Sequence, residues 1–514
     1  MKENDFTERL KNVNQLTVAQ QLLLRNDILK FEARLIRPWW FDSKCEVNVL
    51  VVTDGALNFG IGGFGLSNFL TIFKKMEAES NINIKYNVTL GHRDTPGNLA
   101  MQASNPDFVS TITDFKFDNT NHFTKHKYDQ VWLFGYNASP ISDDEVEVID
   151  KYMNHGGGVF ATGDHGSIGT GLCGKITRVK EMRYWKDFGN GEVSMSQSRR
   201  NDTNTPHSGN VSSFNVGDQS DEYPQNIHAK MYGAAPNVLP HYLLSIKKSI
   251  KSSGIIDIMP DHPHEGECQP EQNFVVKNPE TRNNQSIRTQ NIAISFVNAG
   301  NTSGGKTPTQ AHCFASIGVF DGRPANVGRI VVDATWHHFV NMNLQGFTQA
   351  TLDVIFEYYK NIAKWMTRKK RTFCPYRRYL VHAMLTERIM EANTLDINIK
   401  SADIPDDELF TIGKHAINIV ESELTPADAL EFKIAMLETV VPTLAKKINI
   451  WDLERKPEAD FIHNQFINYE PLVAVAIGLG IARVKDAIGV PSEPITQHTE
   501  MIIQNTFDEG AAEG

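Results

Sequence analysis

The sequence predicts an α/β protein with a mostly parallel sheet and helices on both faces. Short, continuous apolar runs rich in β-branched residues, such as 47–53, are typical of strands buried on both faces of a parallel sheet. Segments with helical periodicity and capping residues separate these runs. Strands that alternate with helices in this way pair in parallel, because each helix returns the chain to the same end of the sheet. We therefore expect residues 47–53 and 159–162 to lie in one sheet.

The elements of this domain can be placed in chain order. Strands are expected at residues 47–53, 84–90, 130–134, 159–162, 255–259, 291–297, 313–319 and 329–334. A Gly-rich turn and a helix at 66–76 follow the first strand, and a helix at 348–366 closes the domain. Ser142 and Glu145 form a capping box that opens a helix through Asn154, and three consecutive glycines end that helix.

The chain has 514 residues, which is too long for one compact core, so several units are expected. Residues 1–42 carry apolar side chains at helical spacing and form an N-terminal helical segment. Residues 43–368 form the α/β domain. Within it, residues from about 185 to 290 are rich in Asn, Ser, Gly, Asp and Pro, which predicts a long insertion on the loop side of the sheet.

Residues 369–514 form a helical C-terminal domain. It begins at the basic cluster 368–371, which is either a phosphate or nucleic-acid patch or a solvated linker. Thr425 and Pro426 have the residue types of a helix N-cap and first helical position. Residues 472–481 are too hydrophobic to face water. We expect this domain to pack on the α/β domain or on a second copy of the chain, in a homo-oligomer.

Charge and composition exclude several classes of protein. The net charge of −10 argues against general nucleic-acid binding, which requires a basic surface. No apolar run is long enough for a membrane span, and the N-terminus lacks the apolar core of a signal peptide. Five scattered cysteines do not form a disulfide framework. We therefore expect a soluble, cytoplasmic protein that acts on a small molecule, with no membrane partner.

Polar clusters follow several of the predicted strands. Asp54 follows the first strand, Gly163–Gly166 follow the strand at 159–162, and Asp261–Glu267 follow the strand at 255–259. Trp336, His337 and His338 follow the last strand. Because parallel strands end at the same edge of a sheet, these side chains are expected to meet there. Carboxylates and imidazoles that converge in this way suit a metal site or a general acid–base site.

The residues can be assigned roles in such a site. The expected ligands of a divalent metal, zinc first, are His165, His262, His264 and His337. The expected catalytic carboxylates are Glu265 or Glu267, which would take a proton from metal-bound water, and Asp164, which would orient an imidazole. The expected substrate contacts are Asp54, Arg183, Arg199 and Trp336. The alternative is that these are unrelated loop residues that cap turns.

His337 and His338 are neighbours, so we expect them to point in different directions, with only one in the site.

Three further motifs lack the context that their chemistry requires. Gly60–Gly65 match a dinucleotide fingerprint but begin too far beyond the strand, which favours a loop that covers the substrate. Gly300–Thr307 match a phosphate-binding loop, but Pro308 and a predicted strand follow where a helix is needed. No nucleotide cofactor is therefore expected. Cys173 and Cys313 do not follow strands as catalytic cysteines would, which favours buried structural roles.

Part of the chain resembles a known family. Residues 128–134, the capped helix through Tyr152 and residues 156–160 resemble the trehalose-utilisation (ThuA-like) branch of the class I glutamine amidotransferase-like superfamily. In that branch a strand follows a triple-glycine turn and leads to a His-containing loop. Residues 328–338 resemble the late strand of the family with its His-bearing end, and 362–366 resemble the closing helix.

The resemblance covers residues 46–366 without the insertion and implies a flavodoxin-like three-layer α/β/α fold. True glutamine amidotransferases carry a nucleophilic Cys where this chain has Gly163–Gly166, so glutaminase chemistry is not expected. The ThuA-like relatives also lack that Cys and are associated with carbohydrate metabolism.

These observations favour a metal-assisted hydrolase or related enzyme that acts on a small polar substrate, for which a sugar derivative is one choice. Two alternatives stay open. One is a non-catalytic ligand-sensing or interaction protein with an amidotransferase-like fold. The other is a cysteine hydrolase.

Overall fold

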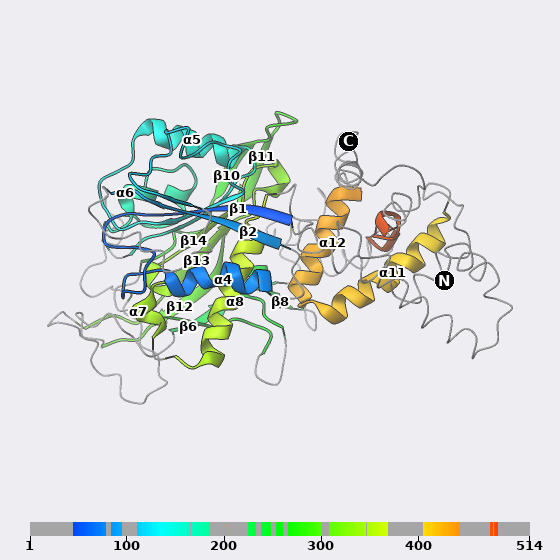
Figure 1. Cartoon of the computed structure of the whole chain (residues 1–514). Coiled ribbons are helices and arrows are strands. Elements are labelled where there is room, and N and C mark those ends of the chain that lie inside the picture. The colour runs from blue at the N-terminus through cyan, green and yellow to red at the C-terminus, as the bar shows by residue number, and fades with distance from the viewer. Residues whose placement is uncertain are drawn as a thin grey trace, which may run out of the picture.

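The computed structural model shows a large mixed sheet with helices on its faces (Figure 1). It describes residues 45–78, 84–94, 110–164, 166–185, 201, 225–232, 238–247, 253–260, 266–300, 308–345, 347–368, 404–440, 473–475 and 477–481. The predicted N-terminal helical segment, 1–42, lies outside the described residues.

Ten strands form the sheet, in the order β3-β2-β1-β4-β5-β14-β13-β12-β6-β9. The first six are parallel to one another. Their bounds are β1 Cys45–Thr53, β2 Ile84–His92, β3 Ser110–Ile112, β4 Gln130–Phe134, β5 Gly158–Thr162 and β14 Ile330–Asp333. The α/β class is therefore confirmed, and residues 47–53 and 159–162 do lie in the same sheet.

The other half of the sheet is antiparallel, which the sequence did not predict. It consists of β13 (His312–Phe320), β12 (Gln290–Val297), β6 (Gln225–Ala229) and β9 (Ile258–Met259). The connection from β13 to β14 contains a single turn of 3-10 helix, Arg323–Ala325, and is too short for a crossover helix. Strands joined in this way can pair only as antiparallel neighbours.

Two helical layers enclose the parallel strands, as predicted. Helices α4 (Ser67–Ala78) and α8 (Gln349–Trp365) cover one face, and α5 (Asp143–Asn154) covers the other (Figure 1). Successive residues of β1 face opposite layers: Val51 packs in the core beneath α4 and α8, and Val52 in the core beneath α5. The alternation explains why the strand is apolar throughout, since both faces are buried.

The predicted start of α5 is confirmed in detail. Glu145 N donates to Ser142 Oγ at 3.2 Å, and Ser142 N donates to Glu145 Oε2 at 3.2 Å. These two bonds are the capping box, which satisfies backbone donors that the helix itself cannot. After the helix, Gly156 has a φ of 84°, a conformation that side chains with a Cβ rarely adopt.

The described residues of the insertion include strands that its composition does not predict. Its described residues include β6 and β9, which continue the sheet, and a hairpin of β10 (Asn273–Lys277) and β11 (Asn284–Arg288). A smaller pair joins β7 (Met231–Tyr232) to β8 (Leu239–Pro240). These strands are short and partly exposed, so they lack the long apolar runs by which a strand can be found in a sequence.

Described C-terminal residues are helical, as expected. They form α11 (Asp406–Glu423), α12 (Pro426–Val440) and the helical residues 473–475 and 477–481. Thr425 Oγ1 accepts from Asp428 N at 3.0 Å, which confirms the predicted N-cap. Val473, Ala474, Ile477 and Ile481 are buried, which agrees with the expectation for this apolar run.

Helix α12 docks on the α/β domain through buried polar contacts. Tyr242 Oη donates to Asp428 Oδ1 at 2.9 Å, and Glu431 Oε2 lies 3.0 Å from Arg323 Nη1. For helix α12, packing on the α/β domain, one of the two places proposed for this domain, is therefore observed.

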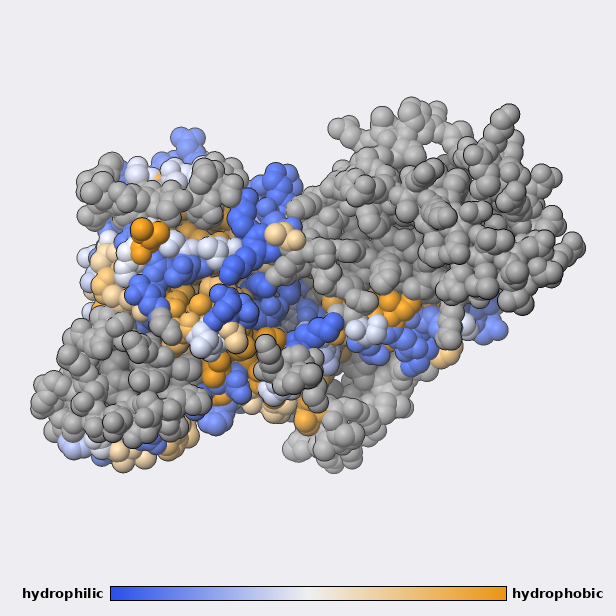
Figure 2. All heavy atoms as spheres, turned by 60° about the horizontal axis from the view of Figure 1, so that its bottom comes forward, coloured by the Kyte–Doolittle hydropathy of each residue, from blue (hydrophilic) through white to orange (hydrophobic). Residues whose placement is uncertain are grey.

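Hydrophilic residues surround smaller groups of hydrophobic ones on the described surface of the face in Figure 2. None of the helices in the described ranges is both long and apolar enough to cross a membrane.

Candidate active site

The parallel strands end at one edge of the sheet, where five of them are followed by polar residues. Asp54 directly follows β1, and Asp94 lies two residues beyond the end of β2. Tyr136 and Asp164 each lie two residues beyond the ends of β4 and β5, and His337 lies in the turn after β14. Helix α4 connects β1 to β2 on one face of the sheet, and α5 connects β4 to β5 on the other. The crossovers change face between β1 and β4, and open α/β sheets bind ligands at this position.

A chain of buried hydrogen bonds joins the ends of β5 and β14. His337 Nε2 lies 3.2 Å from Asp164 Oδ2, and His337 Nδ1 lies 2.8 Å from Asn343 Oδ1. Thr335 Oγ1 donates to the other carboxylate oxygen of Asp164 at 3.2 Å. Asp164 and His337 are 1% and 0% exposed. Asp164 therefore holds the imidazole from one side and Asn343 from the other, and the carboxylate of Asp164 accepts from Nε2.

The two adjacent histidines point in different directions, as predicted. His338 Nδ1 lies 2.7 Å from Asp333 Oδ1, and Tyr358 Oη donates to Asp333 Oδ2 at 2.9 Å. His338 is thus bound to a carboxylate at the end of β14 and to the closing helix α8, apart from the contacts of His337. The reason differs from the predicted one, because both residues lie in a 3-10 turn, Trp336–His338, and not in an extended strand.

Arg183 ties the same two strand ends together through the backbone. Its Nε donates to the carbonyl of Ala334 at 2.9 Å, its Nη2 donates to the carbonyl of Asp164 at 2.7 Å, and its Nη1 donates to that of Tyr184 at 2.9 Å. The side chain is 0% exposed, and its guanidinium packs 4.7 Å from the ring centre of Trp185. In the described structure, the Arg183 guanidinium thus joins the backbone at Asp164, after β5, to the backbone at the end of β14.

Asp54 is a buried carboxylate at the end of β1. Tyr136 N and Asn137 N donate to its Oδ1 at 2.5 and 3.1 Å. Burial raises the pKa of Asp54 to about 6, although these backbone bonds oppose the rise, and the nearby Asp94 adds to it. Asp94 is itself bound by Gly55 N at 2.6 Å. A carboxyl with such a pKa can exchange a proton near neutral pH, and groups of this kind cluster at functional sites.

Aromatic rings lie between Asp54 and the Asp164–His337 pair. Tyr136 stacks on Trp336, with ring centres 6.4 Å apart, and Trp336 lies 4.0 Å from the ring of His337. Phe64 from the Gly-rich loop contacts Trp336 edge-on at 5.6 Å. Within the described residues, Trp336 Nε1 is buried and has no hydrogen-bond acceptor. A buried donor of this kind is costly unless a ligand or water accepts from it, so Trp336 is suited to contact a polar substrate.

The Gly-rich loop at 60–65 is fastened to the end of the sheet by Asn341. The Asn341 amide donates to the carbonyls of Gly60 and Gly62, both at 2.9 Å, and its Oδ1 accepts from Asn68 N at 3.0 Å. One side chain thus secures the loop and caps helix α4. This arrangement places the loop beside Trp336, where the sequence predicted a cover for the substrate.

We expect Asn341→Ala to release this loop. Four hydrogen bonds of a buried side chain are lost, including the bond to Ser67 Oγ at 3.1 Å, so the free energy of unfolding should fall by about 2–3 kcal/mol. Amide hydrogen exchange at residues 58–68 should accelerate, while that of β4 and β5 stays slow. Asn119→Ala in a surface turn is the control. Unchanged exchange in the loop would contradict this role for Asn341.

The structure brings together only some of the predicted site residues. Asp164 and His337 are in direct contact, and Asp54 is linked to them through Tyr136 and Trp336. Five predicted residues lie outside the described part of the chain: His165, Arg199, His262, His264 and Glu265.

Glu267 lies in a segment that packs beside the site. Its carbonyl accepts from Tyr184 N at 3.0 Å. A Cβ on the preceding Gly266 would lie 2.4 Å from the carbonyl of Ala334, so the backbone here touches the end of β14.

Asn343 and Asp94 were not among the predicted site residues. Asp94 has the same signal as Asp54, a carboxylate at the end of a strand, and could have been found by it. Asn343 follows no strand and lies in the short helix α7 (Asn341–Leu344), so nothing in its spacing points to His337.

The metal prediction is not supported by the described residues. They contain no group of three or more His, Cys, Asp or Glu side chains placed to bind a metal ion. Both ring nitrogens of His337 are engaged, so ligation would require it to leave either Asp164 or Asn343.

The two cysteines of the hydrolase alternative differ in environment. Burial raises the pKa of the Cys173 thiol well above its usual value, and its Sγ donates to the carbonyl of Thr162 at 3.8 Å. A neutral, buried thiol is a poor nucleophile. Cys313 is exposed, against the expectation of burial, and lies near the start of β13.

The stretch Gly300–Thr307, which matches the phosphate-binding motif, follows β12 and precedes its antiparallel neighbour β13, as expected of a loop between strands. Its residues 301–307 lie outside the described part.

Comparison of the sequence with models of known families and with curated proteins gives no match.

Proposed function

We propose that the carboxyl edge of the parallel strands is the active site of a hydrolase or related enzyme that acts on a small polar substrate. A carbohydrate-derived substrate is the first choice, because of the resemblance to ThuA-like proteins. The observation that carries the proposal is the buried Asp164–His337–Asn343 chain beside Asp54, a carboxyl with a pKa near 6.

The Asp164–His337 pair and Asp54 suit complementary roles in proton transfer. Asp164 would orient the ring of His337, as a carboxylate does for a catalytic imidazole, and His337 would move a proton to or from the substrate through Nδ1 once the substrate takes the place of Asn343 there. Asp54 is the second proton-transfer group, since its raised pKa allows both protonation states near neutral pH. Trp336 Nε1 would donate a hydrogen bond to the substrate. Arg183, which donates to three carbonyls, holds the ends of β5 and β14 together.

Metal assistance is the part of the proposal that rests on the sequence. Zinc would be held by His165, His262 and His264, with Glu265 or Glu267 as the base that deprotonates metal-bound water. Elemental analysis of the purified protein tests this part separately. We expect about one zinc per chain, and substantially less in His262→Ala/His264→Ala. If the wild-type protein is active but contains no metal, the acid–base proposal stands and the metal proposal is wrong.

We expect Asp164→Asn to abolish most of the turnover. The amide presents a donor where His337 requires an acceptor, so the ring loses its orientation and kcat should fall by about 10²–10⁴-fold. The activity is first sought with a panel of chromogenic glycosides, esters and phosphate esters. Asp118→Asn, at an exposed position, is the matched control. Circular dichroism establishes that each variant is folded.

A fully active, folded Asp164→Asn would contradict the proposed catalytic role. The burial of Asp164 and His337 favours one alternative in particular, a protein that binds its ligand without transforming it. That alternative predicts saturable binding of a small polar molecule to wild-type protein, weakened in Trp336→Phe, without any turnover.

A further inference from the structure

A cavity of about 320 Å³ lies at the opposite edge of the sheet from the proposed active site. It is formed where β5 and β14 begin and where α8 ends, so Gly156, Arg329 and Thr367 line its wall. Small-molecule sites begin at about 300 Å³, so the volume suits a compact ligand. The proposed active site lies where these strands end, which makes the cavity a separate site.

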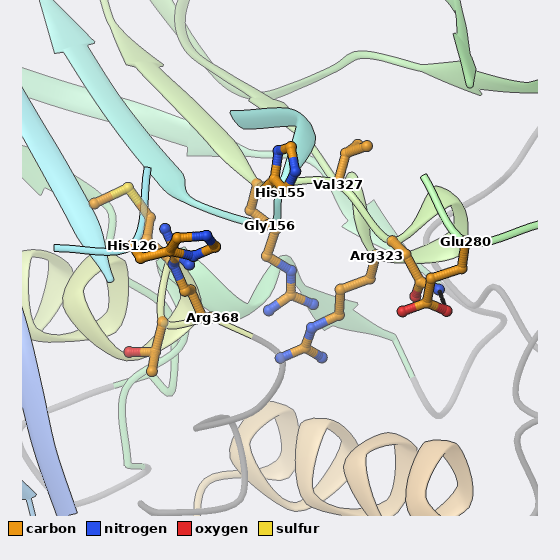
Figure 3. Close-up of a pocket in the computed structure, with 11 residues that line it drawn as sticks. His126, His155, Gly156, Glu280, Arg323, Val327 and Arg368 are labelled. Carbon is orange, nitrogen blue, oxygen red and sulfur yellow. Dashed lines mark hydrogen bonds between the residues drawn. The ribbon is translucent and has the colours of Figure 1, made fainter. Parts of the chain in front are cut away.

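Arginine and histidine side chains predominate in this cavity. Arg323, Arg329, Arg368, His126 and His155 line it, and Glu280 is the single carboxylate among its described lining residues. Figure 3 shows the guanidinium of Arg323 in the middle of the view, with His126 on one side and Glu280 on the other. Lys125 lies next to this wall, and its Nζ donates to His155 Nε2 at 3.1 Å.

The arginines are held in place before any ligand arrives. Arg329 binds both oxygens of Asp321, at 2.9 and 3.2 Å, and it also binds Glu431 and the carbonyl of Trp365, so it supports the wall and has few donors left for a ligand. Arg323 is 3.0 Å from Glu431 on α12. The guanidinium of Arg368 lies 5.1 Å from the ring centre of Tyr152. Fixed guanidinium groups lose little entropy when an anion binds, which favours tight recognition.

The carboxylates that hold the arginines lie behind the cavity wall. Asp321 and Glu431 balance part of the positive charge, but neither lines the cavity. A ligand in the cavity therefore meets the guanidinium and imidazole groups, with carboxylate only at the Glu280 side. There, Asn326 Nδ2 donates to Glu280 Oε2 at 2.7 Å, so the pair offers a polar surface for hydroxyl groups.

We propose that this cavity binds a small phosphorylated molecule, with the phosphoryl group at Arg323 and Arg368 and its hydroxyl-bearing part at Glu280 and Asn326. Several guanidinium groups that converge on one space match the charge and hydrogen-bond geometry of a phosphate. Arg368, the first residue of the basic cluster, thus has a binding role, where the sequence alone also allowed a solvated linker. Nucleic acid fits less well, because the net charge is −10 and the cavity is small.

Isothermal titration calorimetry of the full chain tests the proposal. Inorganic phosphate, glucose 6-phosphate and glucose are titrated separately up to millimolar concentration. We expect saturable binding of the two phosphates with one site per chain, tighter for glucose 6-phosphate, and none of glucose. Binding of inorganic phosphate alone would contradict the part played by Glu280 and Asn326. No saturable binding of either phosphate would overturn the whole proposal.

Two variants test whether phosphate binds in this cavity. Arg368→Gln and Arg323→Gln should each weaken phosphate binding by about tenfold, the effect of one lost charge-assisted contact. Arg288→Gln at the end of β11, which breaks an ion pair with Glu271, is the matched control and should bind normally. Arg323→Gln also disturbs Glu431, so Arg368→Gln decides the result if the other variant does not fold. Unchanged affinity in folded Arg368→Gln would overturn the assignment.

Discussion

Asp54→Asn is expected to stabilise the protein above pH 7. Burial raises the pKa of Asp54 from 3.8 to about 6 in the folded state, so keeping this carboxyl ionised in the folded protein costs about 3 kcal/mol. Asparagine keeps an oxygen that can accept from Tyr136 N and Asn137 N but carries no charge. The free energy of unfolding should therefore rise by up to about 3 kcal/mol at pH 8.

The raised pKa of Asp54 also sets how the free energy of unfolding changes with pH. Between about pH 4 and pH 6 the folded protein retains a proton on Asp54 that the unfolded chain has released, so the contribution of Asp54 to stability falls as the pH rises through this range. Above about pH 6 both states are ionised and the cost is constant. The difference between Asp54→Asn and wild type should thus be largest above pH 7 and vanish near pH 4.

Urea unfolding of both proteins across this pH range makes the measurement, with Asp118→Asn as the exposed control. A stabilising substitution at a buried carboxylate would indicate that the charge is kept for function at the expense of stability. Destabilisation by Asp54→Asn at every pH would show instead that the ionised carboxylate holds the fold together.

Arg183→Met is expected to have the largest destabilising effect, about 3–5 kcal/mol. Methionine fills much of the space of the arginine stem but donates no hydrogen bonds. The carbonyls of Ala334, Asp164 and Tyr184 then lose the donors that the guanidinium supplies in the core. Each unsatisfied buried acceptor costs about 1–3 kcal/mol.

Thermal and urea unfolding measure the effect of Arg183→Met. Arg288→Met is the comparison, because Arg288 has an ion pair with Glu271 but a side chain that is 34% exposed, so its loss should cost about 0–1 kcal/mol. If the two substitutions cost the same, the Arg183 guanidinium would not be the tie between β5 and β14 that its hydrogen bonds indicate.

Much of the parallel half of the fold was predictable from local sequence. β1 and β4 are buried on both faces, so each is a continuous apolar run that can be recognised without knowing its partners. The cap at Ser142 and the start of α12 at Pro426 depend on residues within one turn. Asp54, Asp164 and His337 could be placed at one edge because the ends of parallel strands converge there.

The sequence by itself thus determined the α/β class, the capped helices and the edge at which polar side chains gather, because these follow from periodicity and from nearest neighbours along the chain. Only the tertiary structure decided the partner of each side chain. Arg183 could bind a substrate as well as the carbonyl of Ala334, and Asn341 gives no sign that it fastens residues 60–65. Hydrogen bonds between residues more than a hundred positions apart depend on how the elements pack, and packing has no local signature.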